Sequence, residues 1–239
     1  MDSAVTRWSV GVVIPARDEE DHLCACLDSV RLAADRVERR GDRVEVVVVA
    51  DSCRDSTVAV AESMVRCWGA VLTVEIGSAG GARAAGVRAH LARHDHALES
   101  TWLASTDADT VVPETWIDHQ LGLARLGVAG VAGVVAVDSF TDHPAHVPAR
   151  WAGLYDGPLD DPHPHIHGAN LGLRADAYLA VGGWAALEQG EDRRLWAELQ
   201  GAGYPVASPR SLVVTTSGRA QSRVRGGFAD SLNVLGEAS

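Results

Sequence analysis

The segment WLASTDADTVVPETW, residues 102–116, contains an apolar run that ends in two aspartates separated by one residue. At this spacing the carboxylates of Asp107 and Asp109 repel each other unless a cation lies beside them. Oxygen ligands of this kind are those that Mn²⁺ and Mg²⁺ prefer. The pair therefore indicates a divalent-metal site at the end of a buried strand.

Three further polar segments follow apolar runs: PARDEE (residues 15–20), ADSCRDST (residues 50–57) and GSAGGARAAG (residues 77–86). Taken singly, Asp18 and Asp55 are ordinary helix caps, Arg83 is a solvated helix residue, and the glycines lack the G-x-G-x-x-G spacing of a dinucleotide site. Ligands of an open parallel α/β sheet bind beyond the carboxyl ends of its strands. Together the segments therefore predict one binding site, where Arg83 at a helix N-terminus suits a diphosphate.

Strand-like and helix-like patterns alternate along the chain up to residue 137. We expect strands at residues 9–15, 44–50, 70–76, 101–106 and 130–137, and helices at 18–36, 55–67, 81–93 and from about Pro113. Continuous valine-rich runs mean that both faces of each strand are covered. The sequence therefore predicts an α/β fold, with a mostly parallel central sheet between two helical layers.

Residues 138–167 interrupt this alternation. They contain five prolines and five histidines without a clear period, which is typical of a functional or disordered loop. The histidines are His143, His146, His163, His165 and His167. Their irregular spacing favours ordinary loop polarity over a zinc site. A regular pattern returns with a helix at residues 191–200 and a strand at residues 211–216.

Composition excludes several classes of function. The formal charge of −11 argues against nucleic acid or an anionic membrane surface as the main partner. The 21 basic residues are all arginine, so lysine chemistry such as a Schiff base or a P-loop is absent. The cysteines follow no zinc spacing, and no apolar run is long enough for a signal peptide or a membrane span. We expect a soluble, cytoplasmic protein with reduced thiols.

In their order, these motifs resemble the inverting, nucleotide-sugar-dependent glycosyltransferases of family 2, which have the GT-A fold. IPARDEE is similar to P-x-x-N-E-E with Asp18 in place of Asn, and VVVVADSCRDST to V-D-D-x-S-x-D-x-T with Ala50 in place of the first Asp. GGARAAGV has Ala85 where Asn is usual, and DAD matches the metal-binding D-x-D. GANLGLRADAYLAVGGW and EDRRLWAELQGAGY resemble the acceptor-side segment and the E-D motif. The resemblance covers about residues 10–216.

The resemblance implies a single GT-A domain over residues 1–239, a three-layer sandwich with two halves. Residues 8–137 would bind the nucleotide-sugar, and residues 138–239 would bind the acceptor and supply the catalytic base. In the first half, Pro15 and Ala16 would line the base pocket, Asp51 would contact the base, Glu19 the ribose region and Arg83 the diphosphate.

The resemblance also implies the reacting groups. Asp109 would bind Mn²⁺ or Mg²⁺ directly, Asp107 would reach the ribose or the metal through water, and His167 is the candidate third ligand. Asp192, with Glu191 as the alternative, would take the proton of the acceptor hydroxyl. A family member with a base of this kind transfers the sugar by a single displacement with inversion, so the resemblance implies this mechanism here.

The function expected from these motifs is transfer of one hexosyl or N-acetylhexosaminyl unit to a small or lipid-linked acceptor, since the Q-x-x-R-W motif of processive members is missing. Residues 138–167 would order over the donor sugar, with Trp151 or Tyr155 stacked on it. A homodimer is left open as the assembly.

Two other functions remain open. One is a nucleotidyltransferase that makes a nucleotide-sugar, although PARDEEDH lacks the glycine-rich segment usual after the first strand of such enzymes. The other is an inactive nucleotide-binding module of the same fold, which the departures at Asp18, Ala50 and Ala85 favour.

Overall fold

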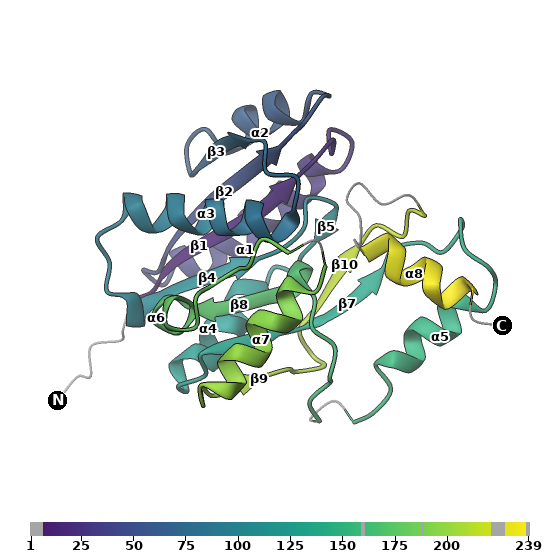
Figure 1. The fold of residues 1–239 in the computed structure, drawn as a ribbon. Coiled ribbons are helices and arrows are strands. Elements are labelled where there is room, and N and C mark those ends of the chain that lie inside the picture. Colours follow the sequence, from purple (N-terminus) through teal and green to yellow (C-terminus); the bar gives the residue numbers. More distant parts are fainter. Residues whose placement is uncertain (1–6, 159–160, 188, 221–227, 238–239) are drawn as a thin grey trace.

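A seven-stranded central sheet has the strand order β3-β2-β1-β4-β8-β6-β9 (Figure 1). Its strands are β1 (Ser9–Ala16), β2 (Arg43–Asp51), β3 (Gly69–Val74), β4 (Thr101–Ser105), β6 (Gly130–Ala132), β8 (Leu171–Arg174) and β9 (Val206–Ala207). β1 runs parallel to β2 and β4, and β2 runs parallel to β3, whereas β8 is antiparallel to β4 and β6. The computed structural model describes residues 7–158, 161–187, 189–220 and 228–237, and it confirms the expected α/β fold with a mostly parallel sheet.

A smaller sheet has the order β5-β10-β7 and consists of β5 (Thr110–Val111), β7 (Val134–Val137) and β10 (Val213–Thr216). The single strand expected at residues 130–137 is therefore two strands, β6 and β7, in two sheets. Gly133 lies between them, and a Cβ there would collide with the side chain of Asn170 and the carbonyl of Leu212. The chain changes sheets at a point where only glycine fits.

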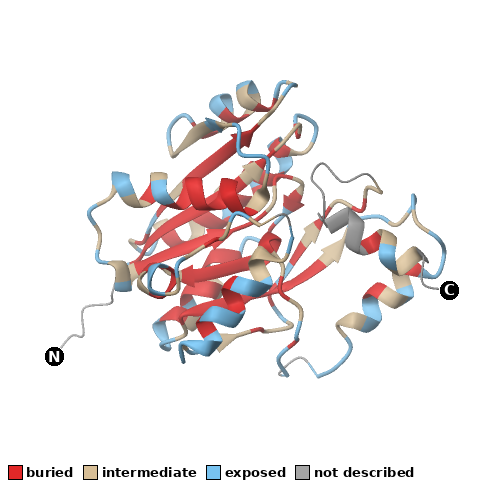
Figure 2. Ribbon diagram, in the orientation of Figure 1, coloured by how far each residue is buried: buried red, intermediate tan, exposed pale blue. Residues whose placement is uncertain are grey.

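The helices are α1 (Leu23–Glu38), α2 (Thr57–Val65), α3 (Ala79–Arg93), α4 (Trp116–Arg125), α5 (Val147–Leu154), α6 (Ala175–Ala180), α7 (Glu191–Gly201) and α8 (Phe228–Glu237), with 3₁₀ turns η1 (Leu98–Ser100) and η2 (Gly168–Asn170). Each face of the central sheet has its own core (Figure 2). Val46 and Val48 of β2 pack in the core of α1 and α4, whereas Val47 and Val49 pack in that of α3, α6 and α7. Alternate residues of one strand are thus buried on opposite faces, as its unbroken valine run predicts.

Helix α1 begins at Leu23, five residues after the start expected at Asp18. Asp18 has a left-handed backbone, with φ +53°, and its carboxylate accepts a hydrogen bond from the N–H of Arg54 at 2.7 Å. Asp18 therefore fixes a turn between two loops and does not cap α1. Asp55 does bind the start of its helix, because its carboxylate accepts a hydrogen bond from the N–H of Thr57, the first residue of α2.

Residues 138–167 carry the helix α5, so the prediction that they form a loop without secondary structure is wrong. Pro148 lies in the first turn, where a missing N–H costs nothing. Trp151 is buried, and its indole N–H donates to the carbonyl of Val135 at 3.1 Å. Its ring belongs to the core and is not free to stack on a sugar. Since α5 packs beside α8 (Figure 1), the expectation that this segment orders only over a ligand loses its basis.

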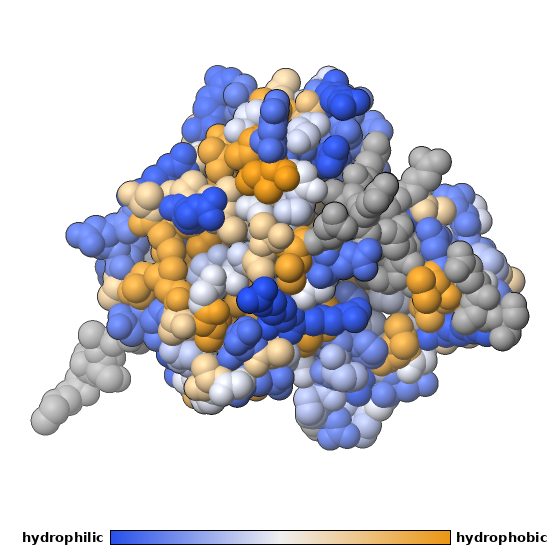
Figure 3. Space-filling view, viewed as in Figure 1, coloured by the Kyte–Doolittle hydropathy of each residue, from blue (hydrophilic) through white to orange (hydrophobic). Residues whose placement is uncertain are grey.

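On the face seen in Figure 3, groups of hydrophobic side chains are interrupted by hydrophilic ones. None of the helices in the described part of the chain combines the length and the apolar character that crossing a membrane requires. All four cysteines are free thiols, as expected from their spacing.

Candidate active site

The carboxyl ends of β1, β2 and β4 lie at one edge of the central sheet, here called the nucleotide edge because the sequence motifs predict a nucleotide site there. In the register of these strands Ala16 lies opposite Ala50, and Val13 lies opposite Ser105. Pro15 and Ala16 therefore end β1 beside Asp51, the last residue of β2. Asp107 and Asp109 follow β4 at the same edge, so the fold gathers the polar segments that the sequence places after separate strands.

Asp51 is buried and shapes the floor of the nucleotide edge. Its carboxylate accepts hydrogen bonds from the backbone N–H groups of Ile76, at 2.7 Å, and Gly77, at 2.8 Å, and from the hydroxyl of Ser52. These bonds hold the loop after β3 against the end of β2. A carboxylate has about four lone-pair sites, so one more donor, such as a base N–H, can still be accepted.

Arg219 links two acids of the nucleotide edge. Its guanidinium donates to both carboxylate oxygens of the buried Glu19, at 2.7 and 2.5 Å, and lies 3.0 Å from Oδ2 of Asp109. The motifs in the sequence missed this residue. One feature of the sequence could have indicated it: Arg219 lies three residues after the strand β10. The last residue of β10, Thr216, pairs with Thr110, which directly follows the D-x-D segment.

Asp109 is the most strongly perturbed carboxylate at this edge. Burial raises its pKa to about 6; Arg219 lowers it, and the neighbouring carboxylates of Asp107 and Glu19 raise it further. The hydroxyl of Thr216 donates to its Oδ1 at 3.2 Å. Even with Arg219 beside it, Asp109 therefore lies where additional positive charge stabilises the anion.

Arg83 lies at the centre of the site and is not a solvated helix residue. Its guanidinium, which is 4% exposed, contacts Oδ1 of Asp107 at 2.5 Å and Oε1 of Glu191 at 2.8 Å. Its Nε donates to the hydroxyl of Ser105, and its plane lies over the ring of Trp184. Burial lowers the pKa of Arg83, but the two carboxylates more than offset this, so the residue stays charged. Arg83 thereby joins the nucleotide edge to α7.

The E-D pair begins helix α7 after Gly190, which has a left-handed backbone. Burial raises the pKa of Glu191, and Arg83 opposes this rise. Asp192 accepts hydrogen bonds from the backbone N–H groups of Gly168, at 3.1 Å, and Arg193, at 2.7 Å. The structure thus brings the predicted catalytic pair next to the GAN segment, but it gives the two acids different partners.

His167 precedes η2 and lies near Asp192. Burial lowers its pKa, and the Asp192 carboxylate raises it only in part, so the ring is a neutral imidazole. Two other histidines of residues 138–167 contact carbonyls, His143 that of Gly218 and His165 that of Leu154. These contacts agree with the ordinary loop polarity that their spacing predicts.

The donor types at the nucleotide edge fit a hard cation. Among the described residues, three or more ligand atoms lie within 4.8 Å of one another in two places, Glu45–His90–His94 and Asp18–Cys53–Asp55. Neither place includes Asp107, Asp109 and His167, so these three do not form a closed protein cage. Mg²⁺ and Mn²⁺ bind through one or two carboxylates plus phosphate oxygens, which two aspartates at the mouth of a nucleotide site can provide.

The model of glycosyl transferase family 2 matches residues 11–182 of the chain, which include β1, the D-x-D segment and β8. The chain belongs to this family. A comparison with curated protein sequences gives no match. Since the matched region ends at residue 182, the assignment does not rest on the E-D pair or on Arg219.

Solved structures with low sequence identity share the fold of this family 2 chain. Mannosyltransferase PcManGT from Pyrobaculum calidifontis, solved with GDP-Man and Mn²⁺, is 18% identical over 91% of this chain and 59% of that chain, with a TM-score of 0.66. GalNAc-T7, solved with UDP, GalNAc and Mn²⁺, is 13% identical over 93% of this chain and 45% of that chain, with a TM-score of 0.64. TarS from S. aureus is 12% identical over 87% of this chain and 36% of that chain, with a TM-score of 0.63. These similarities confirm the GT-A fold, and this chain spans 36% to 59% of the length of the three.

Proposed function

We propose that the protein transfers a single hexosyl or N-acetylhexosaminyl unit from a nucleoside-diphosphate sugar to a hydroxyl acceptor, with inversion and with Mn²⁺ or Mg²⁺. The observation that carries the proposal is the buried Asp109 carboxylate, whose pKa is raised to about 6, beside Asp107 at the nucleotide edge. Two structures of the same fold, PcManGT and GalNAc-T7, were solved with a nucleotide and Mn²⁺, which supports it.

In this proposal residues 8–137 bind the donor. Pro15 and Ala16 line the pocket for the base, Asp51 accepts a hydrogen bond from it, and Glu19 faces the ribose. Asp51 is already fixed by two backbone N–H groups, so its remaining acceptor site is held in one direction. Such preorganisation reduces the entropy lost on binding.

Asp109 is the direct metal ligand, Asp107 binds the metal through water or meets the ribose, and His167 is a further candidate ligand. The bound metal supplies Lewis-acid stabilisation of the leaving diphosphate. The protein adds two guanidinium groups, because Arg83 holds Asp107 and Arg219 holds Asp109. Both arginines are placed to meet phosphate oxygens, which guanidinium groups bind in a bidentate manner.

Asp192 is the base that takes the acceptor proton. Glu191 is committed to an ion pair with the buried Arg83, which opposes the rise that burial causes in its pKa and occupies one of its carboxylate oxygens. Asp192 is held by backbone N–H groups and lies on the side of residues 138–239, where we place the acceptor. Attack from this side, opposite the diphosphate, gives inversion. The acceptor is a small or lipid-linked molecule, and a cytoplasmic monomer or homodimer is the form we propose.

Titration calorimetry with and without Mn²⁺ tests the assignment. Wild-type protein is expected to bind a nucleoside diphosphate only with Mn²⁺, and Asp109→Asn to lose this binding, because a lone Asp107 does not replace a direct ligand. Asp118→Asn is the matched control, since Asp118 pairs with Arg36 on the surface of α4. A preference for nucleoside triphosphates would favour a nucleotidyltransferase, and the absence of any nucleotide binding would overturn the proposal in favour of an inactive module.

A further inference from the structure

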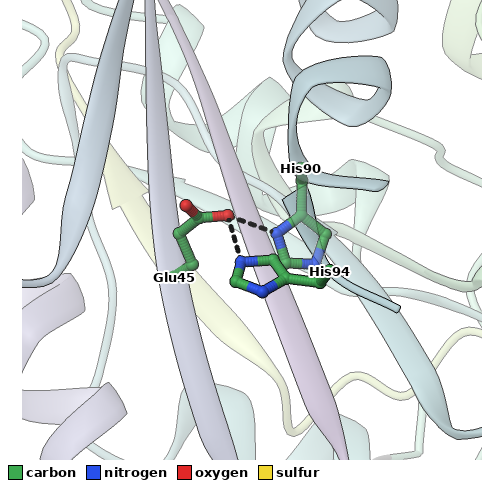
Figure 4. Close-up of side chains that lie close together, drawn as sticks. All are labelled: Glu45, His90 and His94. Carbon is green, nitrogen blue, oxygen red and sulfur yellow. Dashed lines mark hydrogen bonds and ion pairs between the residues drawn. The ribbon is translucent and has the colours of Figure 1, made fainter. Parts of the chain in front are cut away.

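Glu45, His90 and His94 form a cluster far from the nucleotide edge (Figure 4). Glu45 lies near the start of β2, six residues before Asp51, which at about 3.3 Å per residue places the cluster roughly 20 Å from that edge. His90 lies in the last turn of α3, and His94 directly follows this helix. The two imidazoles and the carboxylate point toward one another from two different elements.

The nitrogen and oxygen atoms of the cluster converge on one point, at separations slightly shorter than those around a bound ion. Nδ1 of His90 lies 2.6 Å and Nε2 of His94 lies 3.0 Å from the same oxygen, Oε2 of Glu45. Zinc binds nitrogen and oxygen at about 2.0–2.2 Å, which separates the ligands of a tetrahedral site by about 3.3 Å. An outward shift of Glu45 and of the partly exposed His94 would therefore make room for the ion. His94 has an extended backbone, which turns its ring from the end of α3 toward Glu45.

The site is built into the packing of the protein. Gly11 lies opposite Glu45 in the β1–β2 register, and a Cβ at Gly11 would lie 2.5 Å from the ring of His90. β1 thus leaves space for this imidazole, which is 1% exposed, and whose Nε2 has no hydrogen-bond partner among the described residues. The ring of His90 is fixed by its surroundings before any ion binds.

The partially open side of the cluster is at His94. Its side chain is 35% exposed, which leaves a position for water as the fourth ligand. The ring of His96 stacks on that of His94, with 5.6 Å between centroids, and Arg93 contacts Oε1 of Glu45 at 3.4 Å. Arg93 therefore orients the second carboxylate oxygen and leaves Oε2 to the two imidazoles.

We propose that Glu45, His90 and His94 bind a Zn²⁺ ion, at a second metal site that is separate from the one at the nucleotide edge. Two imidazoles and one carboxylate are the protein ligands of known three-ligand zinc sites. The nucleotide edge offers carboxylates, which suit Mn²⁺ and Mg²⁺. The chemistry of the ligands therefore directs different ions to the two sites. Zinc would fix the last turn of α3 to β2, and α3 also carries Arg83 into the active site.

Calorimetry with Zn²⁺ and the visible absorption of bound Co²⁺ test this site. To exclude the nucleotide edge, both are measured in the Asp109→Asn variant, which is expected to retain one tight Zn²⁺ site. Adding His94→Ala should weaken Zn²⁺ binding at least tenfold and remove the absorption of tetrahedral Co²⁺. His96→Ala is the matched control, since His96 contacts the ring of His94 but not Glu45. Zn²⁺ at one hundred times its Kd should raise the Tm by roughly 5–10 °C, and only when His94 is present.

Glu45→Gln, which keeps the shape and the hydrogen-bond acceptor of Glu45, tests the same site if His94→Ala lowers the yield of folded protein. It is also expected to weaken Zn²⁺ binding at least tenfold. Zn²⁺ binding that is equal in wild-type protein, His94→Ala and Glu45→Gln would overturn the proposal. So would the absence of saturable Zn²⁺ binding in wild-type protein, since the cluster would then be an ion-pair network alone.

Discussion

Two arginines offset about half of the charge of four buried or half-buried carboxylates in the candidate active site. Arg83 contacts Asp107 and Glu191, and Arg219 contacts Glu19 and Asp109. Burying a carboxylate without a partner is costly, so each arginine stabilises the site before any ligand is present. In the proposed reaction the same guanidinium groups would also meet the phosphates of the donor.

Arg219→Ala is expected to separate the two roles of this residue. Affinity for a nucleoside diphosphate with Mn²⁺ should fall at least tenfold, because a charged hydrogen bond contributes about 1.5–3 kcal/mol. Mn²⁺ alone should bind no more weakly than to wild-type protein, since a cation that competes for Asp109 has been removed. Both constants are measured by calorimetry, with Arg174→Ala, which removes the partner of Asp176, as the control. Equal losses in both constants would show that Arg219 only supports the fold.

The two acids of the E-D pair are expected to respond differently to amide substitution. Asp192→Asn should lower turnover by about 10²–10⁴ with unchanged donor affinity, because an amide cannot take the acceptor proton. Glu191→Gln should mainly lower the Tm, since it leaves the buried Arg83 with one carboxylate fewer. Product formation at saturating donor and thermal unfolding distinguish the two. A severe loss of turnover in Glu191→Gln with a mild one in Asp192→Asn would reverse the assignment.

Asp109 is expected to destabilise the metal-free protein at neutral and alkaline pH. An unfolded aspartate has a pKa of 3.8, and burial raises that of Asp109 to about 6. Because the pKa is higher in the folded protein, ionisation of Asp109 opposes folding. The loss of folding free energy is absent below pH 3.8 and grows as the pH rises through 6. It reaches at most about 3 kcal/mol. With a chelator present, Asp109→Asn should therefore have a higher Tm than wild-type protein at pH 8 and an equal one at pH 4. A lower Tm at pH 8 would mean that the ion pair with Arg219 outweighs burial.

At the scale of elements, the periodic parts of the fold could be predicted, and the breaks in periodicity could not. β1, β2 and β4 have unbroken apolar runs, so their ends and the acids beyond them follow from the pattern. The run at residues 130–137 is equally apolar, yet it divides at Gly133 because Asn170 and Leu212 from distant segments pack against that point. Similarly, α5 has a proline in its first turn, and the pattern alone assigns this segment to a loop.

Two glycine substitutions test whether Gly133 is a structural requirement. Gly133→Ala should lower the free energy of unfolding by several kcal/mol, because its Cβ would overlap backbone and a buried amide. Gly122→Ala is the matched control within α4, where a Cβ meets nothing within 4 Å, and it should raise the free energy of unfolding by about 0.5–1 kcal/mol. Urea unfolding followed by circular dichroism measures both. If Gly133→Ala leaves the free energy of unfolding unchanged, the chain adjusts between β6 and β7 to accommodate the added Cβ.

At the scale of the whole molecule, the candidate site depends on contacts that local sequence patterns do not contain. The family motifs predicted Asp107, Asp109 and Asp51 because Asp51 ends β2 and the other two follow β4 within four residues. Arg219 lies 200 positions from Glu19, which it contacts, and no motif marks it. No sequence motif marks Glu45 either, since its two histidine partners lie at the end of α3, three elements after β2. Long-range pairs of this kind require the three-dimensional fold.

The span between Glu19 and Arg219 also has a consequence for the order of folding during synthesis. The four adjacent strands that pair in parallel, β1 to β4, have all been made by residue 105, so this part of the sheet can form early on a growing chain. Glu19 and Asp109 then lie at its edge without their guanidinium group until residue 219 has been made. Until then the acids of this edge have only one of their two arginine partners, Arg83. The ability to hold the donor is therefore expected to be among the last properties that the chain acquires.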